Sequence, residues 1–201
     1  RSPFLVLTSA DTILAPDALE NLCLPFLSHE NIGIIAGRPL HKNSIDSFIG
    51  FVVLFQGHLR HCLSLVYPKF SELIAFRNVV PSIPPTFVDE EEIAAIIKAK
   101  GYRLSYVPEG AFYNKGPEDL REFLSQRKRN HIGHILLARK YRYEAVTLRG
   151  RSVFKYLFKG LPLEYKKRWF WLGAAIVMEI FVRILSRLEN FFKSGLYDYI
   201  W

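Results

Sequence analysis

The sequence predicts an α/β fold, because short apolar runs typical of buried strands alternate with segments that have the spacing of amphipathic helices. Phe4–Thr8 and Ile32–Ala36 are such runs, and residues 19–27 between them place their apolar side chains at helical intervals. The chain has 201 residues, of which half are hydrophobic, so it is long enough for one sizeable domain with a buried core.

The first elements are two strands and the helix that joins them. Phe4–Thr8 ends in small polar residues, as a buried parallel strand does. Pro16 and Asp17 open a helix that continues to about Leu27. Ile32–Ala36 is expected to be a second buried strand of the same sheet.

The middle of the chain is expected to hold a long helix, a short strand and a loop. Asn43 and Ser44 are residue types that cap helices, and they precede a helical pattern over residues 45–66. Residues 73–76 form a short extended piece. Residues 80–86 contain three prolines and are therefore a loop.

Two further helices and a strand follow. Residues 89–100 predict a helix that begins with four acidic residues, and Gly101 ends it in the left-handed conformation. Residues 102–107 alternate like a strand. Pro117 suits the first turn of a helix that continues through the basic run at residues 126–130.

Charge is distributed unevenly along the chain. Residues 1–120 carry a net charge of −3, whereas residues 121–190 carry +11, out of a total of +8. This asymmetry argues against a uniformly basic nucleic-acid-binding protein. It indicates that the N-terminal part, residues 1–120, is catalytic or metal-binding, and that the basic part, residues 121–190, contacts phosphates or an anionic membrane surface.

The last third of the sequence has the character of membrane-interface helices. Residues 152–160 predict a basic amphipathic helix, which either lies in a membrane interface or packs as an ordinary surface helix. Lys166–Arg168 then precede an apolar run that starts at Trp169, a typical flank of a membrane entry. Glu179 and Arg183 interrupt this run, so we expect a helix along the membrane, or packed on a neighbour, rather than a span.

The spacing of the cysteine and histidine residues does not by itself predict a disulfide framework or a metal site. Cys23 and Cys62 are interpreted as reduced core thiols of a cytosolic setting, with a disulfide as the alternative. The pairs His58/His61 and His131/His134 have i, i+3 spacing, but no third ligand accompanies them, which favours core or polar-network histidines over a zinc site.

Three clusters are candidates for chemistry. Asp11 directly follows a strand, where it could bind a divalent cation or cap a helix. The acids of residues 89–92 exceed what helix capping requires, and one of them could be a general base. Gln126, Arg129 and Asn130 share one helix face that suits phosphate binding, although a solvated basic face is the alternative.

The order and spacing of these motifs resemble the family 2 glycosyltransferases of the GT-A fold. The resemblance covers about residues 3–140. In chain order, its motifs are Ser9-Ala10-Asp11-Thr12, residues 69–77, Asp89-Glu90-Glu91 before a helix that ends in Lys-Gly-Tyr-Arg, Tyr106-Val107-Pro108-Glu109, and Gln126-Arg127-Lys128-Arg129. It implies that residues 1–145 form the C-terminal portion of a partial GT-A domain with a Rossmann-like mixed sheet. Residues 146–201 would then form membrane-associated helices. The family's first strands, which bind the nucleotide base, have no counterpart, so the resemblance implies a chain truncated at its N-terminus.

The resemblance also implies roles for individual residues. Asp11 corresponds to the metal-binding acid of the family's Asp-x-Asp element, with Mg²⁺ or Mn²⁺ as the cofactor. Glu90, with Asp89 as the other candidate, corresponds to the catalytic base, and Glu72 lies in the acceptor-side segment. Gln126, Arg127 and Arg129 correspond to the element that holds the diphosphate and the acceptor end.

Two functions follow as hypotheses. The first is an inverting glycosyltransferase at the cytoplasmic face of the cell membrane, which moves a sugar from a nucleotide-sugar donor to a lipid or glycan acceptor. The second is a non-catalytic membrane-surface protein that keeps the fold and has lost donor binding.

Overall fold

A computed structural model describes residues 2–141, 143, 156 and 161–192. In chain order the elements are β1 (Phe4–Thr8), β2 (Ile13–Leu14), α1 (Ala18–Ser28), β3 (Ile32–His41), α2 (Phe48–Ser64), β4 (Leu73–Arg77), α3 (Asp89–Ala99), β5 (Arg103–Asn114), α4 (Leu120–Tyr141), α6 (Leu163–Lys167) and α7 (Trp169–Phe192). The strands form one mixed sheet in the order β1-β4-β3-β5-β2. The α/β, Rossmann-like class expected from the sequence, followed by an apolar C-terminal helix, is confirmed.

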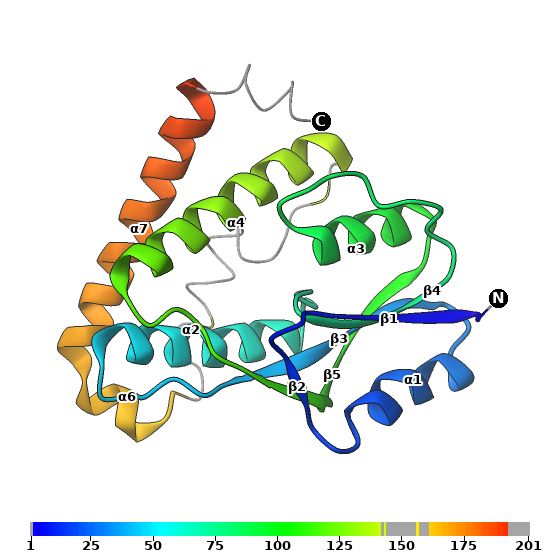
Figure 1. Cartoon of the computed structure of the whole chain (residues 1–201), viewed down its shortest axis with the longest axis horizontal. Coiled ribbons are helices and arrows are strands. Elements are labelled where there is room, and N and C mark those ends of the chain that lie inside the picture. Colours follow the sequence, from blue (N-terminus) through cyan, green and yellow to red (C-terminus); the bar gives the residue numbers. More distant parts are fainter. Residues whose placement is uncertain (1, 142, 144–155, 157–160, 193–201) are drawn as a thin grey trace.

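Strand β3 lies at the centre of the sheet, parallel to β5 and antiparallel to β4. Successive side chains of a strand point to opposite faces, so Ile34 and Ile35 enter different layers. Ile34 packs in a core with α3 and α4, whereas Ile35 packs in a second core with α1. The sheet is therefore covered by α1 on one face and by α3 and α4 on the other (Figure 1).

The prediction that Phe4–Thr8 is a buried parallel strand is wrong. β1 pairs antiparallel with β4 and forms the outer strand of the sheet. Leu5 and Val6 keep 39% and 41% of their surface exposed. A run of four apolar residues and a threonine identifies a strand, but it does not specify the direction of its partner or its position in the sheet.

Two helices begin later than predicted. α2 starts at Phe48, and its N-cap is Ser47, whose hydroxyl accepts a hydrogen bond from the Gly50 N–H at 3.0 Å. Asn43, the expected cap, instead accepts from the Gly116 N–H and donates to the Gly116 and Pro117 carbonyls. These contacts place Pro117 in a loop, so α4 begins at Leu120 rather than around this proline.

Other local predictions are confirmed. Gly101 follows α3 with a φ of +87°, the left-handed conformation expected there. Cys23 and Cys62 form no disulfide within the described residues, although both are half-buried rather than in the core. A separate observation concerns Gly133 of α4, where an added Cβ would lie 3.0 Å from the side chains of Phe87 and Val88.

Helix α7 turns a polar stripe inwards, formed by Glu179, Arg183, Ser186 and Asn190. Glu179 pairs with Arg127 and Glu189 with Lys128, which fixes α7 along α4, and the two helices lie side by side in Figure 1. Packing on a neighbouring segment, one of the two arrangements expected, is therefore confirmed for this stripe. By length and composition alone α7 could also cross a membrane, and 22% of its most apolar window is buried in the protein.

The remainder of the C-terminal prediction is untested. Residues 152–160, expected to form a basic amphipathic helix, lie outside the described residues except for Tyr156. The division of the chain into residues 1–145 and 146–201 stays a prediction.

A buried carboxylate joins three parts of the fold. Glu91 at the start of α3 is 1% exposed and accepts hydrogen bonds from the Lys69 ammonium, the Phe70 N–H and the Tyr143 hydroxyl. Burial lowers the pKa of Lys69, and Glu91 opposes that effect. The pair therefore depends on each partner, since a buried charge without its counter-charge is costly.

We predict that Glu91→Gln destabilises the protein by about 3–5 kcal/mol, because it leaves the Lys69 charge buried and unpaired. Urea unfolding followed by circular dichroism measures this free energy. The control is Glu118→Gln, which breaks the Lys115–Glu118 pair, whose side chains are 59% and 66% exposed. Such an exposed pair contributes less than about 1 kcal/mol. Equal losses in the two variants would contradict the role given to Glu91.

Candidate functional site

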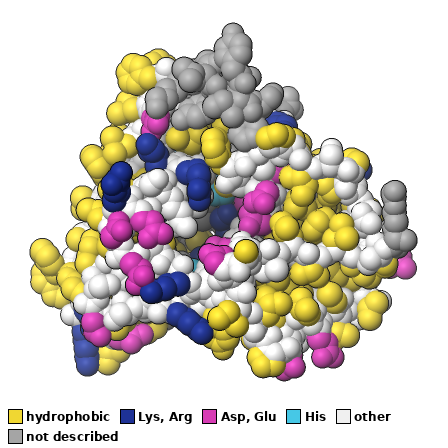
Figure 2. Space-filling model, viewed as in Figure 1, with side chains coloured by type: hydrophobic (Ala, Val, Ile, Leu, Met, Phe, Trp, Pro, Cys, Tyr) yellow, Lys and Arg dark blue, Asp and Glu magenta, His cyan; other side chains and the backbone are white. Residues whose placement is uncertain are grey.

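A cavity of about 630 Å³ opens beside one edge of the sheet. It lies where the carboxyl ends of β1, β3 and β5 meet the amino end of β4, the edge at which ligands gather in open α/β sheets. Helices α2, α3, α4 and α7 supply the remaining walls. Figure 2 shows the hollow with acidic and basic side chains around its rim and further basic groups inside.

The start of α3 forms the acidic wall. Asp89, Glu90 and Glu91 line the cavity, but both oxygens of Glu91 are occupied by Lys69, Phe70 and Tyr143. Glu92 pairs with Lys140. Two of the four consecutive acids are therefore held in structural contacts, and Asp89 and Glu90 are left to face a ligand.

Glu90 has an unusual protonation equilibrium. Burial raises the pKa of its carboxyl to about 8, and the hydrogen bond and charge of Asp89 add to that effect. A carboxyl with a pKa near the working pH is suited to accept a proton from a hydroxyl group.

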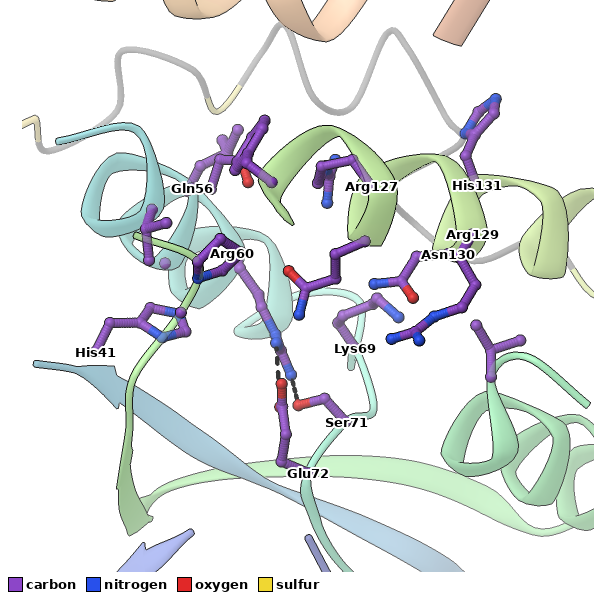
Figure 3. Close-up of a pocket in the computed structure, with 18 of the residues that line it drawn as sticks. His41, Gln56, Arg60, Lys69, Ser71, Glu72, Arg127, Arg129, Asn130 and His131 are labelled. Atoms are coloured by element: carbon purple, nitrogen blue, oxygen red, sulfur yellow. Dashed lines mark hydrogen bonds and ion pairs between the residues drawn. The ribbon is translucent and has the colours of Figure 1, made fainter. Parts of the chain in front are cut away.

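Helix α4 forms the cationic wall. Gln126, Arg127, Arg129 and Asn130 all line the cavity, and Figure 3 shows Arg127 on the side of α7 and Arg129 on the side of α3. Arg127 donates to Glu179 of α7 at 2.7 and 3.2 Å. Arg129 is exposed and has no ion pair within the described part of the chain, so its guanidinium is available to an anion.

The floor of the cavity is a polar cluster around Glu72. Arg60 of α2 contacts Glu72 at 3.6 Å and donates a hydrogen bond to the Ser71 hydroxyl (Figure 3). Burial alone would raise the pKa of Glu72, but Arg60 and Ser71 outweigh it and hold the pKa below its usual value. His41 lies beside Asn114 on the neighbouring strand, and burial next to Arg60 lowers its pKa. The cluster thus combines an ionised carboxylate with a neutral imidazole.

The histidine pairs occupy polar surroundings. His61 lies 2.9 Å from the Tyr106 hydroxyl, and His58 lies 3.6 Å from the Cys62 thiol. His131 and His134 are buried at the cavity wall, where burial lowers the pKa of both. Core or polar-network histidines were expected from the sequence, and both kinds are present, since His61 contacts a hydroxyl while His131 and His134 are buried.

Asp11 is exposed at the cavity mouth, in the turn after β1. Within the described residues, no three His, Cys, Asp or Glu side chains come together as ligands for a metal ion. A single carboxylate nevertheless fits a cation of the Mg²⁺ type, which takes one or two carboxylates and completes its shell with substrate phosphates and water. Asp11 fits an ion that arrives together with a diphosphate, and the described residues hold no preformed metal cage.

Comparison with known proteins gives structural similarity but no sequence match. No family model matches the sequence, and no curated protein matches it. The fold is similar to a mannosyltransferase from Pyrobaculum calidifontis, PcManGT, whose structure was solved with GDP-Man and Mn²⁺. The TM-score is 0.49 at 18% identity, over 95% of this chain and 55% of that protein, so the chain spans about half of its length. The function is therefore argued from the cavity.

All the site residues expected from the sequence lie around this one cavity: Asp11, Glu72, Asp89, Glu90, Gln126, Arg127 and Arg129. They come from segments up to 118 residues apart. The motif order selects these residues, and the fold brings them together around one cavity. Their chemical roles stay predictions.

Several cavity residues were not anticipated as part of the site. Arg60 and Gln56 are polar residues four apart in helix α2, whose first half is apolar, and Glu179 and Arg183 have the same spacing in α7. Polar pairs at this spacing lie on one helix face, so they indicated inward-facing polar surfaces. Spacing along each helix does not show that both surfaces face the same cavity.

The raised pKa of Glu90 predicts a pH-dependent cost to stability. From its ordinary pKa of 4.5 up to about 8, the folded protein keeps a proton that the unfolded chain has lost. The folded state therefore binds more protons over this range, and the Glu90 contribution to stability falls as the pH rises.

Glu90→Gln removes that cost, so we expect it to stabilise the protein by about 1–3 kcal/mol at pH 8.5 and by almost nothing at pH 4.5. Urea unfolding at a series of pH values measures the difference. Glu20→Gln, on the exposed part of α1, is the control for removing one carboxylate. A difference between wild type and Glu90→Gln that does not change with pH would refute the assignment.

Proposed function

We propose that this protein is a glycosyltransferase that moves a sugar from a nucleotide-sugar donor to an acceptor hydroxyl, with inversion at the sugar carbon. The observation that carries the proposal is the cavity itself, in which Glu90, a carboxyl with a raised pKa, faces the cationic wall of α4. The order of the motifs along the chain, which resembles that of family 2 glycosyltransferases, gives independent support.

In the proposed reaction Glu90, with Asp89 as its neighbour, accepts the proton of the acceptor hydroxyl. The acceptor oxygen then forms a bond to the anomeric carbon while the bond from that carbon to the diphosphate breaks. The electron pair of the broken bond stays on the leaving nucleoside diphosphate. Only the ionised form of Glu90 accepts a proton, so the rate should rise with pH towards about 8.

The basic residues of α4 would stabilise the charge that develops on the leaving group. Arg129 and Arg127 line the wall on which a diphosphate would lie, and guanidinium groups donate to phosphate oxygens in pairs. Asp11 at the mouth would hold the Mg²⁺ or Mn²⁺ ion that accompanies the diphosphate. When bound, that ion would neutralise part of the diphosphate charge.

We also propose that the protein acts at a membrane surface, with the cytoplasmic face of the cell membrane as its location and a lipid or glycan as the acceptor. One face of α7 exposes large apolar residues, among them Trp169 (74%), Phe170 (72%) and Phe192 (79%). A groove of about 620 Å³ between α7, α4 and α2 adds further apolar surface. Lys166, Lys167 and Arg168 precede this face and would meet anionic headgroups.

We predict that Arg129→Ala weakens the binding of UDP or GDP, whichever the wild type prefers, at least tenfold in the presence of Mn²⁺. The variant removes a charge-assisted contact of about 1.5–3 kcal/mol and breaks no described ion pair. Isothermal titration calorimetry measures the affinity. Chelation of the metal and the Asp11→Ala variant should each lower it as well.

The matched control is Arg121→Ala, an exposed arginine of the same helix that does not line the cavity. It should bind nucleotide as the wild type does. Wild-type affinity in Arg129→Ala would contradict the assignment of the cationic wall. A wild-type protein that binds no nucleoside diphosphate would favour the second hypothesis, a non-catalytic membrane-surface protein.

A separate prediction concerns the apolar face of α7. The double variant Trp169→Ser, Phe170→Ser should lower binding to phosphatidylcholine–phosphatidylserine vesicles at least tenfold. The reason is that each aromatic side chain that enters the membrane contributes about 1.5–3 kcal/mol to binding. Co-sedimentation with the vesicles measures it. Leu27→Ser, at an equally exposed apolar position of α1 (75%), should leave binding unchanged. Equal binding by all three proteins would exclude this face as the membrane contact.

A further inference from the structure

An ionic cluster at the junction of three helices forms one wall of the cavity. The Glu179 carboxylate of α7 accepts hydrogen bonds from Arg127 of α4 at 2.7 and 3.2 Å. It also accepts from Arg183 of α7 at 2.9 Å and from the Gln56 amide of α2 at 3.3 Å. Four donor contacts from three side chains thus converge on a single carboxylate, and all of these residues line the cavity.

The charges of this cluster favour an ionised Glu179. Burial alone would raise the pKa of Glu179, but Arg127 and Arg183 outweigh it, so the pKa is lowered. The neighbouring His131 is kept neutral, because burial and Arg183 lower its pKa to about 4. Two guanidinium groups and one carboxylate leave the cluster with one net positive charge at the cavity wall.

The geometry fixes the direction of the Arg127 side chain. Its Nε and one Nη donate to Glu179, and no described residue accepts from the other Nη. Two bonds to a planar guanidinium define its plane as well as its position. Without them the long side chain would sample many rotamers, which would have to be ordered again whenever an anion binds.

We propose that Glu179 is a positioning residue, which acts through Arg127 to hold the anion-binding wall ready for a diphosphate group. The proposal rests on the proposed function, because it takes the ligand of this wall to be a diphosphate. It makes α7 a part of the site, since this helix supplies the carboxylate that orients a binding residue of α4.

The test is the affinity for inorganic pyrophosphate and for UDP or GDP in Glu179→Gln. Simple electrostatics predicts tighter binding, because the substitution removes a negative charge from the cavity wall. A positioning role predicts the opposite, and we expect binding at least fivefold weaker. In an Arg127→Ala background, Glu179→Gln should cause no further loss, since Glu179 acts through that arginine.

The matched control is Glu189→Gln, which breaks the 2.8 Å pair with Lys128 on the same seam between α4 and α7, away from the cavity. It should lower thermal stability by a similar amount and leave the affinity for pyrophosphate within twofold of wild type. If Glu179→Gln does not fold, Glu179→Asp keeps the charge but withdraws the carboxylate, and it should also weaken binding at least threefold.

The positioning role would be overturned if Glu179→Gln bound pyrophosphate as tightly as wild type or more tightly. It would also be overturned if Glu189→Gln lost as much affinity for pyrophosphate as Glu179→Gln. Either result would leave the proposed function intact. A wild-type protein that binds neither pyrophosphate nor a nucleoside diphosphate would overturn both.

Discussion

The structure depends most on the buried ion pair between Lys69 and Glu91. Lys69 precedes β4, and Glu91 lies in the first turn of α3, so the pair fixes this helix against the end of the sheet. The Tyr143 hydroxyl, just beyond α4, donates to the same carboxylate. Glu91 also borders the cavity, but its two oxygens are occupied by these contacts, so Asp89 and Glu90 are the acids of this turn that are left to face a ligand. One structural contact therefore determines which acids are available for chemistry.

A second constraint is the double role of α7. Its inner side carries Glu179 and Arg183 into the cavity wall, and its outer side exposes large apolar residues. In Figure 2 hydrophobic side chains follow the edge of the molecule that α7 occupies in Figure 1. The charges in the middle of α7 are paired, because Glu179 accepts hydrogen bonds from Arg127 of α4 and from Arg183 of its own helix. Helix α7 therefore completes the cavity wall with one side, while its other side stays apolar and exposed.

The sequence predicted the parts of the fold that depend on local chemistry. Helical spacing located α1, α2, α3 and α4, and motif order selected site residues that all line one cavity. It could not predict that β1 pairs antiparallel at the edge, because pairing direction depends on contacts with β4, about 70 residues away. Nor could it predict the partner of Arg127, which is separated from it by 52 residues. Ion pairs of this kind are set by helix packing, and spacing along one helix carries no information about them.

Arg127 and Arg129 illustrate how packing gives similar residues different electrostatic states. Both belong to the same basic run, yet Arg127 is oriented and partly neutralised by Glu179, whereas Arg129 is exposed and without a described ion pair. An exposed cation attracts an anion from solution but must be ordered when the anion arrives. A cation already fixed in place attracts more weakly at a distance but requires no reorganisation as charge develops. In the proposed reaction, Arg129 would therefore capture the diphosphate, and Arg127 would stabilise it as the bond to the sugar breaks.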